Sequence, residues 1–223
     1  LKPSAPSLMI GSAPFPVSLN DLTTEVLSRA ETLFSDWGNE ALTTQLGPGN
    51  RAESPAPRTT FFLLDKPGAA QSIIRAGHLS IPRDHPDFYA LSLLDYAFGG
   101  HFSARLNQNL RQNKGYSYGY HSWIQWHRGS SMLLAGGGVQ TSKTGEAVAE
   151  TLREFAEIRE GHPVSTTELE DARSGLLRGL PESFETPQQV LSHLAELVLF
   201  DLPHTYLSAF SAHMDAVSLA DVQ

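Results

Sequence analysis

The chain has 223 residues, an apolar content of 40%, a net charge of −8 and no cysteine. The lack of cysteine excludes disulfides and thiolate metal ligands, and an acidic chain without a basic cluster is a poor partner for nucleic acid or an anionic membrane surface. No apolar run is long enough to cross a bilayer, and the opening segment lacks the regions of a signal peptide, so we expect the sequence to begin within a longer protein.

The first part of the chain predicts one helix between irregular stretches. A short apolar run at 8–10 precedes a helix that begins at Ser18 or Asn20 and stops at Gly38, because the apolar residues between these points keep helical spacing. The Pro- and Gly-rich stretch 47–57 then predicts a loop.

Two strands and a helix are predicted next. The apolar runs at 59–64 and within 71–81 are short and bounded by Pro or Gly, as strands are. A helix is expected after Pro86, ending at the glycine pair Gly99 and Gly100.

A second helix is predicted directly after this pair. Arg111 shares a face with Asn107 and Gln108, away from the apolar stripe, so its guanidinium is expected to point away from the core. Gly115 ends the helix. The buried stripe, with an apolar residue at every fourth position, consists of Phe102, Leu106 and Leu110.

An aromatic strand is predicted over 116–126, where aromatic and other residues alternate with a period of two. This pattern places Tyr116, Tyr118 and Tyr120 on one face. Because the chain turns at Gly115, Arg111 and Tyr118 can project into the same space, where a guanidinium and a phenol can hold a substrate carbonyl and its developing charge. The alternative is a solvated arginine beside half-buried tyrosines.

The second half predicts a hairpin followed by helices. Glycines 136–138 are expected to permit close backbone approach rather than to bind phosphate, because no Lys-Ser/Thr follows at Walker spacing. The predicted elements are the hairpin strand 131–139, a helix at 147–158, a helix after the capping-box residues Ser165 and Glu168, and a helix from Thr186 to about Phe200.

Three histidines invite a metal interpretation. His193 and Glu196 form half of an H-x-x-E-H motif, but Leu197 stands where the second histidine is required, so a surface or packing role is expected for His193. His78 and His85 have no further ligand at a suitable spacing, and ordinary polar roles are expected for them.

The segment 99–120 resembles the C-terminal-half signature of the insulinase/pitrilysin-type zinc peptidases, the inverzincins, in which G-G-x-x-S-x-R-L precedes L-R-x-x-x-G-x-x-Y. Tyr116 departs from the small or aliphatic residue often found there. Flanking phrases extend the resemblance over nearly the whole chain. The matching positions are Gly99, Gly100, Ser103, Arg105, Leu106, Leu110, Arg111, Gly115 and Tyr118.

This resemblance implies an α+β fold, with a mostly antiparallel sheet and helices packed on one face. Residues 1–223 are then a single C-terminal-half domain of the inactive type, part of a longer chain, without the H-x-x-E-H zinc motif. The order of the predicted elements agrees, because it lacks regular βαβ alternation.

The resemblance also implies a function. The chain is the non-catalytic, substrate-binding half of a zinc-dependent metalloendopeptidase, and Arg111 and Tyr118 bind the substrate carbonyl and stabilise the tetrahedral intermediate. The chain itself holds no metal; zinc belongs to an H-x-x-E-H half or subunit, which is the expected partner besides a peptide substrate. Further substrate contacts are expected from Tyr116, Tyr120, Gly99 and Gly100.

Two alternatives stay open. The first is a structural core subunit of the same fold without protease chemistry. The second is an independent metal hydrolase using His193, Glu196 and a distant residue. Relatives of the bacterial paired-subunit type are often exported, so the resemblance favours the periplasm, and a homodimer or heterodimer is possible.

Overall fold

The computed structural model describes residues 19–35 and 58–223, in two compact units that divide after Gly47. The predictions for 8–10, Gly38 and 47–57 lie outside the described residues. No helix in the described ranges has the length and apolar character needed to span a membrane. The elements are α1 (Leu19–Phe34), β1 (Gln71–Ser80), α3 (Phe88–Asp95), η1 (Tyr96–Gly100), α4 (Arg105–Asn107), η2 (Gln108–Asn113), β2 (Ser117–Gln125), β3 (Ser131–Gln140), η3 (Thr141–Lys143), α5 (Thr144–Ala156), η4 (Glu157–Gly161), α6 (Thr166–Gly179), η5 (Pro181–Phe184), α7 (Pro187–Leu199), α8 (Tyr206–Ala216) and α9 (Leu219–Val222).

The first unit contributes the predicted amphipathic helix, α1. An ion pair between Arg29 and Glu25, 2.6 Å apart and one turn from each other, supports its exposed side. Its apolar residues Leu27, Leu33 and Phe34 are exposed.

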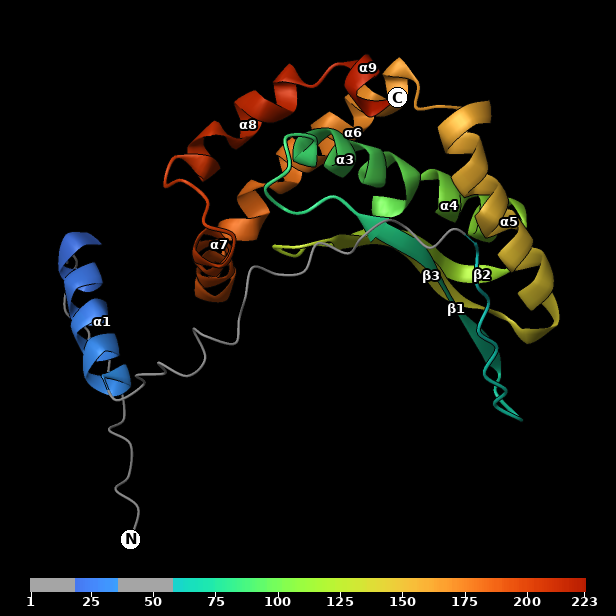
Figure 1. Ribbon diagram of the computed structural model, residues 1–223, viewed down its shortest axis with the longest axis horizontal. Helices are drawn as coiled ribbons and strands as arrows, with labels where there is room; N and C mark the ends of the chain where they lie inside the picture. Colours follow the sequence, from blue (N-terminus) through green and yellow to red (C-terminus); the bar gives the residue numbers. More distant parts are fainter. Residues whose placement is uncertain (1–18, 36–57) are drawn as a thin grey trace, which may run out of the picture. The chain divides into compact units, whose positions relative to one another are not determined.

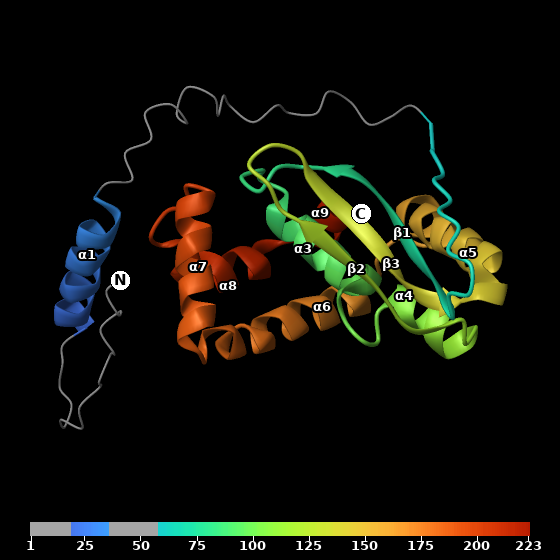
Figure 2. The same cartoon turned by 90° about the horizontal axis from the view of Figure 1, so that it is seen from below.

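The second unit is built on a three-stranded antiparallel sheet in the order β1-β3-β2. Figure 1 shows α3, α4 and α5 on one face of this sheet, and Figure 2 looks onto the face that these helices do not cover. Strand β3 is central, pairing Ile74 of β1 with Gly137 and Trp123 of β2 with Leu134. This arrangement confirms the predicted α+β class, the antiparallel sheet and the one-sided helical layer.

The prediction of a strand at 59–64 is wrong. The segment is irregular, and its residues Phe61 to Leu64 are 66–91% exposed. Among the described residues it forms no ladder with a strand, and an extended apolar run becomes a strand only where a partner accepts its backbone hydrogen bonds. The neighbouring prediction within 71–81 is confirmed by β1.

Glycines 136–138 do permit close backbone approach, as predicted. A Cβ atom on Gly136 would lie 2.1 Å from the Ile74 carbonyl oxygen, and one on Gly137 would lie 2.4 Å from the Gly119 carbonyl oxygen. Side chains at these positions would therefore push the outer strands away from β3.

Two apolar clusters hold the helices in place. The first lies between the sheet and the helical layer and includes Phe98, Leu106, Leu110 and Tyr120. The second joins α3, α6, α8 and α9 through Leu93, Ala97, Val164, Leu169, Ala172 and Met214. Together they bury the apolar residues of the helix that ends at the glycine pair, and Leu106 and Leu110 of the helical segment that follows.

The predicted capping box starts α6. The Ser165 side chain accepts the backbone N–H of Glu168, whose carboxylate accepts the Ser165 N–H at 2.9 Å. Thr186 caps α7 in the same way with Gln189, and Pro187 occupies the first helical position as predicted.

Candidate functional site

Arg111 lies near the end of a widened helical turn. Helix α4 begins at Arg105 rather than at Phe102 and passes into the π-helical turn η2, where the Lys114 N–H donates to the Asn109 carbonyl at 3.0 Å. Leu110 is fully buried as predicted, whereas Phe102 is 57% exposed and was wrongly assigned to the buried stripe. The reason is that Phe102 precedes the helix, so helical spacing does not apply to it.

The exposed Phe102 ring instead supports the Arg111 guanidinium. The guanidinium carbon lies 4.2 Å from the ring centroid, and the nitrogen Nη1 is buried without a hydrogen-bond partner among the described residues. A buried donor left unpaired costs about 1–3 kcal/mol. Arg111 is thus held in place by stacking while one of its donors remains unused.

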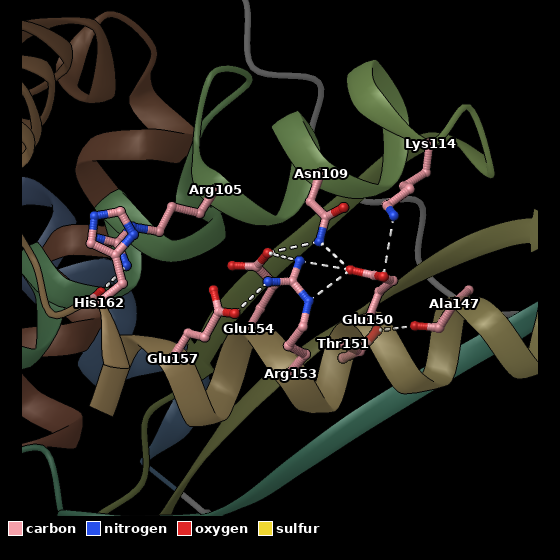
Figure 3. Close-up of polar contacts among 10 residues, drawn as sticks. All are labelled: Arg105, Asn109, Lys114, Ala147, Glu150, Thr151, Arg153, Glu154, Glu157 and His162. Carbon is pink, nitrogen blue, oxygen red and sulfur yellow. Dashed lines mark hydrogen bonds and ion pairs between the residues drawn. The ribbon is translucent and has the colours of Figure 1, made fainter. Parts of the chain in front are cut away.

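Asn109 anchors η2 to α5 through carboxylates (Figure 3). Its amide donates to Glu150 at 2.9 Å and to Glu154 at 2.7 Å, and Arg153 bonds the same two carboxylates. The hydrogen bond from Asn109, followed by those from Arg153 and Lys114, lowers the pKa of Glu150 to about 2 against the opposing effect of burial. This network fixes the turn that carries Arg111.

Tyr118 reaches solvent because strand β2 contains a β-bulge. The chain turns at Gly115, which has a φ of 64°, and β2 then pairs Ser117 with Val139 but Tyr120 with Gly137. The partners are three residues apart on β2 but only two residues apart on β3, so β2 contains one extra residue between them. As a result Tyr118 is 89% exposed while Tyr120 is fully buried. The prediction that the tyrosines share one face is wrong for this pair.

Tyr120 belongs to the core, which corrects its expected role as a substrate contact. Its ring has no exposed surface, and its hydroxyl lies 2.7 Å from the Thr151 hydroxyl on α5. Tyr116 is half-buried against the first cluster, and the Lys143 ammonium lies 5.6 Å from its ring centroid. Of the three tyrosines, Tyr118 alone presents its side chain fully to solvent.

Asn107 is also corrected, since it was expected on an outward face with Arg111. It is fully buried; its amide oxygen accepts the Tyr120 N–H at 3.1 Å and its amide nitrogen donates to the Phe102 carbonyl at 2.6 Å. The outer edge of β2 therefore has a side-chain partner at this point, which sequence spacing does not reveal.

The glycine pair is a packing feature. A Cβ atom on Gly99 would lie 2.4 Å from the Ser122 nitrogen and 2.8 Å from Leu106 Cδ1, so only glycine lets η1 approach β2. On Gly100, which is exposed, a Cβ atom would lie 3.2 Å from the Asp95 carbonyl oxygen. Gly99 is thus enclosed by protein, and Gly100 is the member of the pair that a ligand can reach.

Arg105, the arginine of the S-x-R-L phrase, ties α4 to the start of α6. Its guanidinium bonds both oxygens of Glu168, at 2.5 and 2.7 Å, and donates to the carbonyls of His162 and Pro163. The hydrogen bond from Arg105 lowers the pKa of Glu168 to about 2. Its donors are committed within the chain, in contrast to those of Arg111.

The residues considered for a metal site are engaged elsewhere. His193 Nε2 lies 2.8 Å from the Ser183 hydroxyl, and its ring stacks on Phe184 with centroids 4.3 Å apart, which confirms the packing role. Glu196 accepts from the buried Arg83 at 3.1 Å. Across the described ranges no group of three His, Asp or Glu residues could hold an ion, so these side chains do not fit a zinc site.

Comparison with known proteins identifies similar chains. The family model described as "Peptidase M16 inactive domain" matches residues 20–176. The sequence is 26% identical over 163 residues to the uncharacterised zinc protease YmxG of Bacillus subtilis (strain 168), covering 73% of this chain and 40% of that protein. This chain therefore spans about two fifths of the relative's length.

Solved structures share the fold. A peptidase M16 inactive domain from Pseudomonas fluorescens superposes with a TM-score of 0.62 and 24% identity, covering 69% of this chain and 37% of that one. A protease from Helicobacter pylori superposes with a TM-score of 0.62 and 17% identity, covering 70% and 38%. These similarities agree with the family resemblance read from the segment 99–120.

Proposed function

Because this chain belongs to the peptidase M16 inactive-domain family, we propose that it is the substrate-binding half of a zinc-dependent metalloendopeptidase. The zinc-bearing H-x-x-E-H motif lies in another domain or subunit, which pairs with this chain to complete the site. The name of the relative YmxG, a zinc protease more than twice as long as the matched segment, supports this division.

Arg111 carries the proposal, because its buried Nη1 has no acceptor among the described residues. A peptide carbonyl oxygen satisfies such a donor, and the interaction strengthens when the oxygen acquires negative charge in the tetrahedral intermediate. The stacking on Phe102 and the anchoring of η2 by Asn109 hold the guanidinium before substrate binds. This preorganisation is what oxyanion stabilisation requires.

Tyr118 supplies the second donor in this proposal. Its side chain is exposed, and its hydroxyl makes no hydrogen bond within the described part of the chain, so it is free to meet a substrate. The bulge in β2 gives Tyr118 this exposure. Tyr116 and Gly100, which are not fully buried, are the accessory substrate contacts in this proposal.

The test is the peptidase activity of the assembly formed by this chain and its zinc-bearing half. We expect Arg111→Ala and Tyr118→Phe each to lower kcat about a hundredfold or more, which corresponds to the loss of ~2.7–4 kcal/mol of transition-state stabilisation. Bound zinc and the unfolding temperature of this chain should be retained, because neither side chain forms a hydrogen bond with the described residues.

Arg159→Ala serves as the matched control, because Arg159 is an exposed arginine whose one ion pair within the described ranges is with its neighbour Glu160. Its kcat should equal that of the wild type. Unchanged activity in both Arg111→Ala and Tyr118→Phe would contradict the proposal and favour the structural core subunit.

A further inference from the structure

A second candidate site lies beside the outer edge of β2. A cavity of about 380 Å³ is bounded by α3, η1 and α6 on one side and by the end of β2 on the other. Its walls include Asp95, Tyr96, Ser122, Trp123, Trp126 and Leu176. It is separate from the Arg111 turn, because neither Arg111 nor Tyr118 contributes to its lining.

Asp95 is a carboxylate without a compensating cation. Its Oδ1 is buried and has no hydrogen-bond partner in the described ranges, and none of the ion pairs there involves Asp95. Burial raises the pKa of Asp95 to about 6, and the neighbouring Ser122 only partly offsets this, so the group is still mainly ionised at neutral pH.

Two other enclosed carboxylates in the described part of the chain do have a cationic partner. Glu154 is paired with Arg153 at 3.1 Å, and Glu168 with Arg105 at 2.5 Å. A buried charge is normally paired because desolvation is otherwise uncompensated. The Asp95 carboxylate at the cavity lacks such a partner, and a positively charged ligand would supply one.

The aromatic side chains that line the cavity also favour a positively charged ligand. Trp126 and Tyr96 add aromatic side chains to the lining, and aromatic rings attract cations through their π faces. The Trp123 ring already contacts a cation within the chain, since the Arg75 guanidinium of β1 lies 5.2 Å from its centroid. A carboxylate combined with aromatic walls matches a guanidinium or an ammonium group on an apolar stem.

We propose that this cavity binds a basic side chain of the peptide substrate, with Asp95 as its carboxylate partner. The assignment to substrate rests on the proposed function. Ser122 follows Tyr118 by four residues on the same strand, which is roughly 13 Å at the rise of a β-strand. An extended peptide held at Tyr118 therefore reaches the cavity with a side chain about four residues away.

The first experiment measures binding to the isolated chain, without the zinc-bearing half. The probes are an acetylated and amidated Ala-Ala-Arg-Ala-Ala peptide and the same peptide with citrulline, its neutral isostere. By calorimetry or tryptophan fluorescence, the arginine peptide should bind at least about tenfold more tightly, and Asp95→Asn should abolish this difference.

Asp215→Asn is the matched control, because Asp215 is exposed on α8 and the chemical change is identical. It should retain the wild-type preference. Asp95→Asn is expected to unfold at or above the wild-type temperature, since it removes an uncompensated buried charge. Equal affinity for the two peptides, or an unaltered preference in Asp95→Asn, would overturn the proposed cation site.

A second experiment separates the cavity from the role of Arg111. In the assembled peptidase, substrates with arginine or citrulline about four residues from the scissile bond are compared by kcat/KM. The arginine-to-citrulline ratio should fall about tenfold in Asp95→Asn but stay at its wild-type value in Tyr118→Phe, even as kcat itself drops. If arginine is preferred over citrulline in the binding experiment but not in cleavage, the cavity does not bind the substrate. This conclusion does not depend on the activity of Arg111→Ala.

Discussion

Three buried side-chain nitrogen or oxygen atoms of the described residues lack hydrogen-bond partners, namely Arg111 Nη1, Asp95 Oδ1 and His101 Nδ1. Each such atom costs about 1–3 kcal/mol relative to a paired one. Two of them belong to the groups proposed to bind substrate, which is where a protein is expected to give up stability for function. The two groups have opposite charges. In the two proposals, the Arg111 guanidinium binds a carbonyl oxygen and the Asp95 carboxylate binds a cation.

At the same scale, Gly99 has a packing role that can be measured. Gly99→Ala should lower the free energy of unfolding by about 1–3 kcal/mol, because the new Cβ would lie 2.4 Å from the backbone of Ser122. Denaturant unfolding of the isolated chain checks this. Gly145→Ala is the control, since nothing lies within 4 Å of its Cβ position, and its stability should stay the same or rise slightly. Equal stability of the two variants would contradict the packing role.

At the scale of elements, two irregularities create the candidate site from ordinary secondary structure. The π-helical turn η2 brings Arg111 to the end of its helix, and the bulge in β2 directs Tyr118 and Tyr120 to different environments. Both irregularities are of kinds found at functional sites. The polar links to α5 and α6 hold the helix that carries Arg111 in place.

The ion pair between Arg105 of α4 and Glu168 of α6 predicts that the stability of the chain depends on pH. Glu168 has a folded-state pKa of about 2, below its ordinary 4.5, so it contributes stability that is present above pH 4.5 and is lost as the pH falls towards 2. Arg105→Gln should therefore destabilise the chain at pH 7 by about 1–3 kcal/mol, allowing for the partial exposure of Glu168. The gap from the wild type should narrow as the pH is lowered to 2, leaving the part that comes from the hydrogen bonds of Arg105 to the His162 and Pro163 carbonyls.

Unfolding curves at pH 7, 4 and 2 test this expectation. Lys143→Gln is the control, because Lys143 of η3 and Glu146 of α5, three residues apart in sequence, form an exposed ion pair 2.9 Å apart. Surface pairs contribute little, so this variant should follow the wild type at every pH. A gap for Arg105→Gln that is the same at pH 7 and pH 2 would show that Glu168 is not the group involved.

At the scale of the whole molecule, the proposed function divides the chemistry between this chain and a partner. Its family is that of inactive M16 domains, and in the described residues the candidate ligands His193 and Glu196 bond Ser183 and Arg83 instead of facing each other. In this proposal the chain contributes the donors of Arg111 and Tyr118 and the cavity beside Asp95. The proposed zinc-bearing half supplies the remaining chemistry.

This division predicts the response to metal. The unfolding temperature of the isolated chain should be the same with excess EDTA and with added zinc, because ligands that bind only the folded state raise that temperature. The activity of the assembly should be lost in EDTA and restored by zinc. A rise in the unfolding temperature of this chain with zinc would reveal a ligand set that the described residues do not form.

The sequence by itself determined the features that arise from neighbouring residues. Helical spacing, capping boxes and the hairpin signal predicted α5, α6, α7 and the β2–β3 pair, because each depends on contacts within a few residues. The signature at 99–120 likewise identified the family. Arg111 and Tyr118 were found by that signature, and the open donor of Arg111 and the exposure of Tyr118 agree with their proposed role.

Only the tertiary structure decided which of these residues face solvent. A single inserted residue in β2 buried Tyr120 and exposed Tyr118, and an irregular entry to α4 removed Phe102 from the apolar stripe. Among the described residues, the apolar run at 59–64 pairs with no strand. The surroundings of the unpaired Asp95 carboxylate come from elements that are distant in sequence. Burial and pairing are properties of contacts between elements, and residue spacing along one element does not contain them.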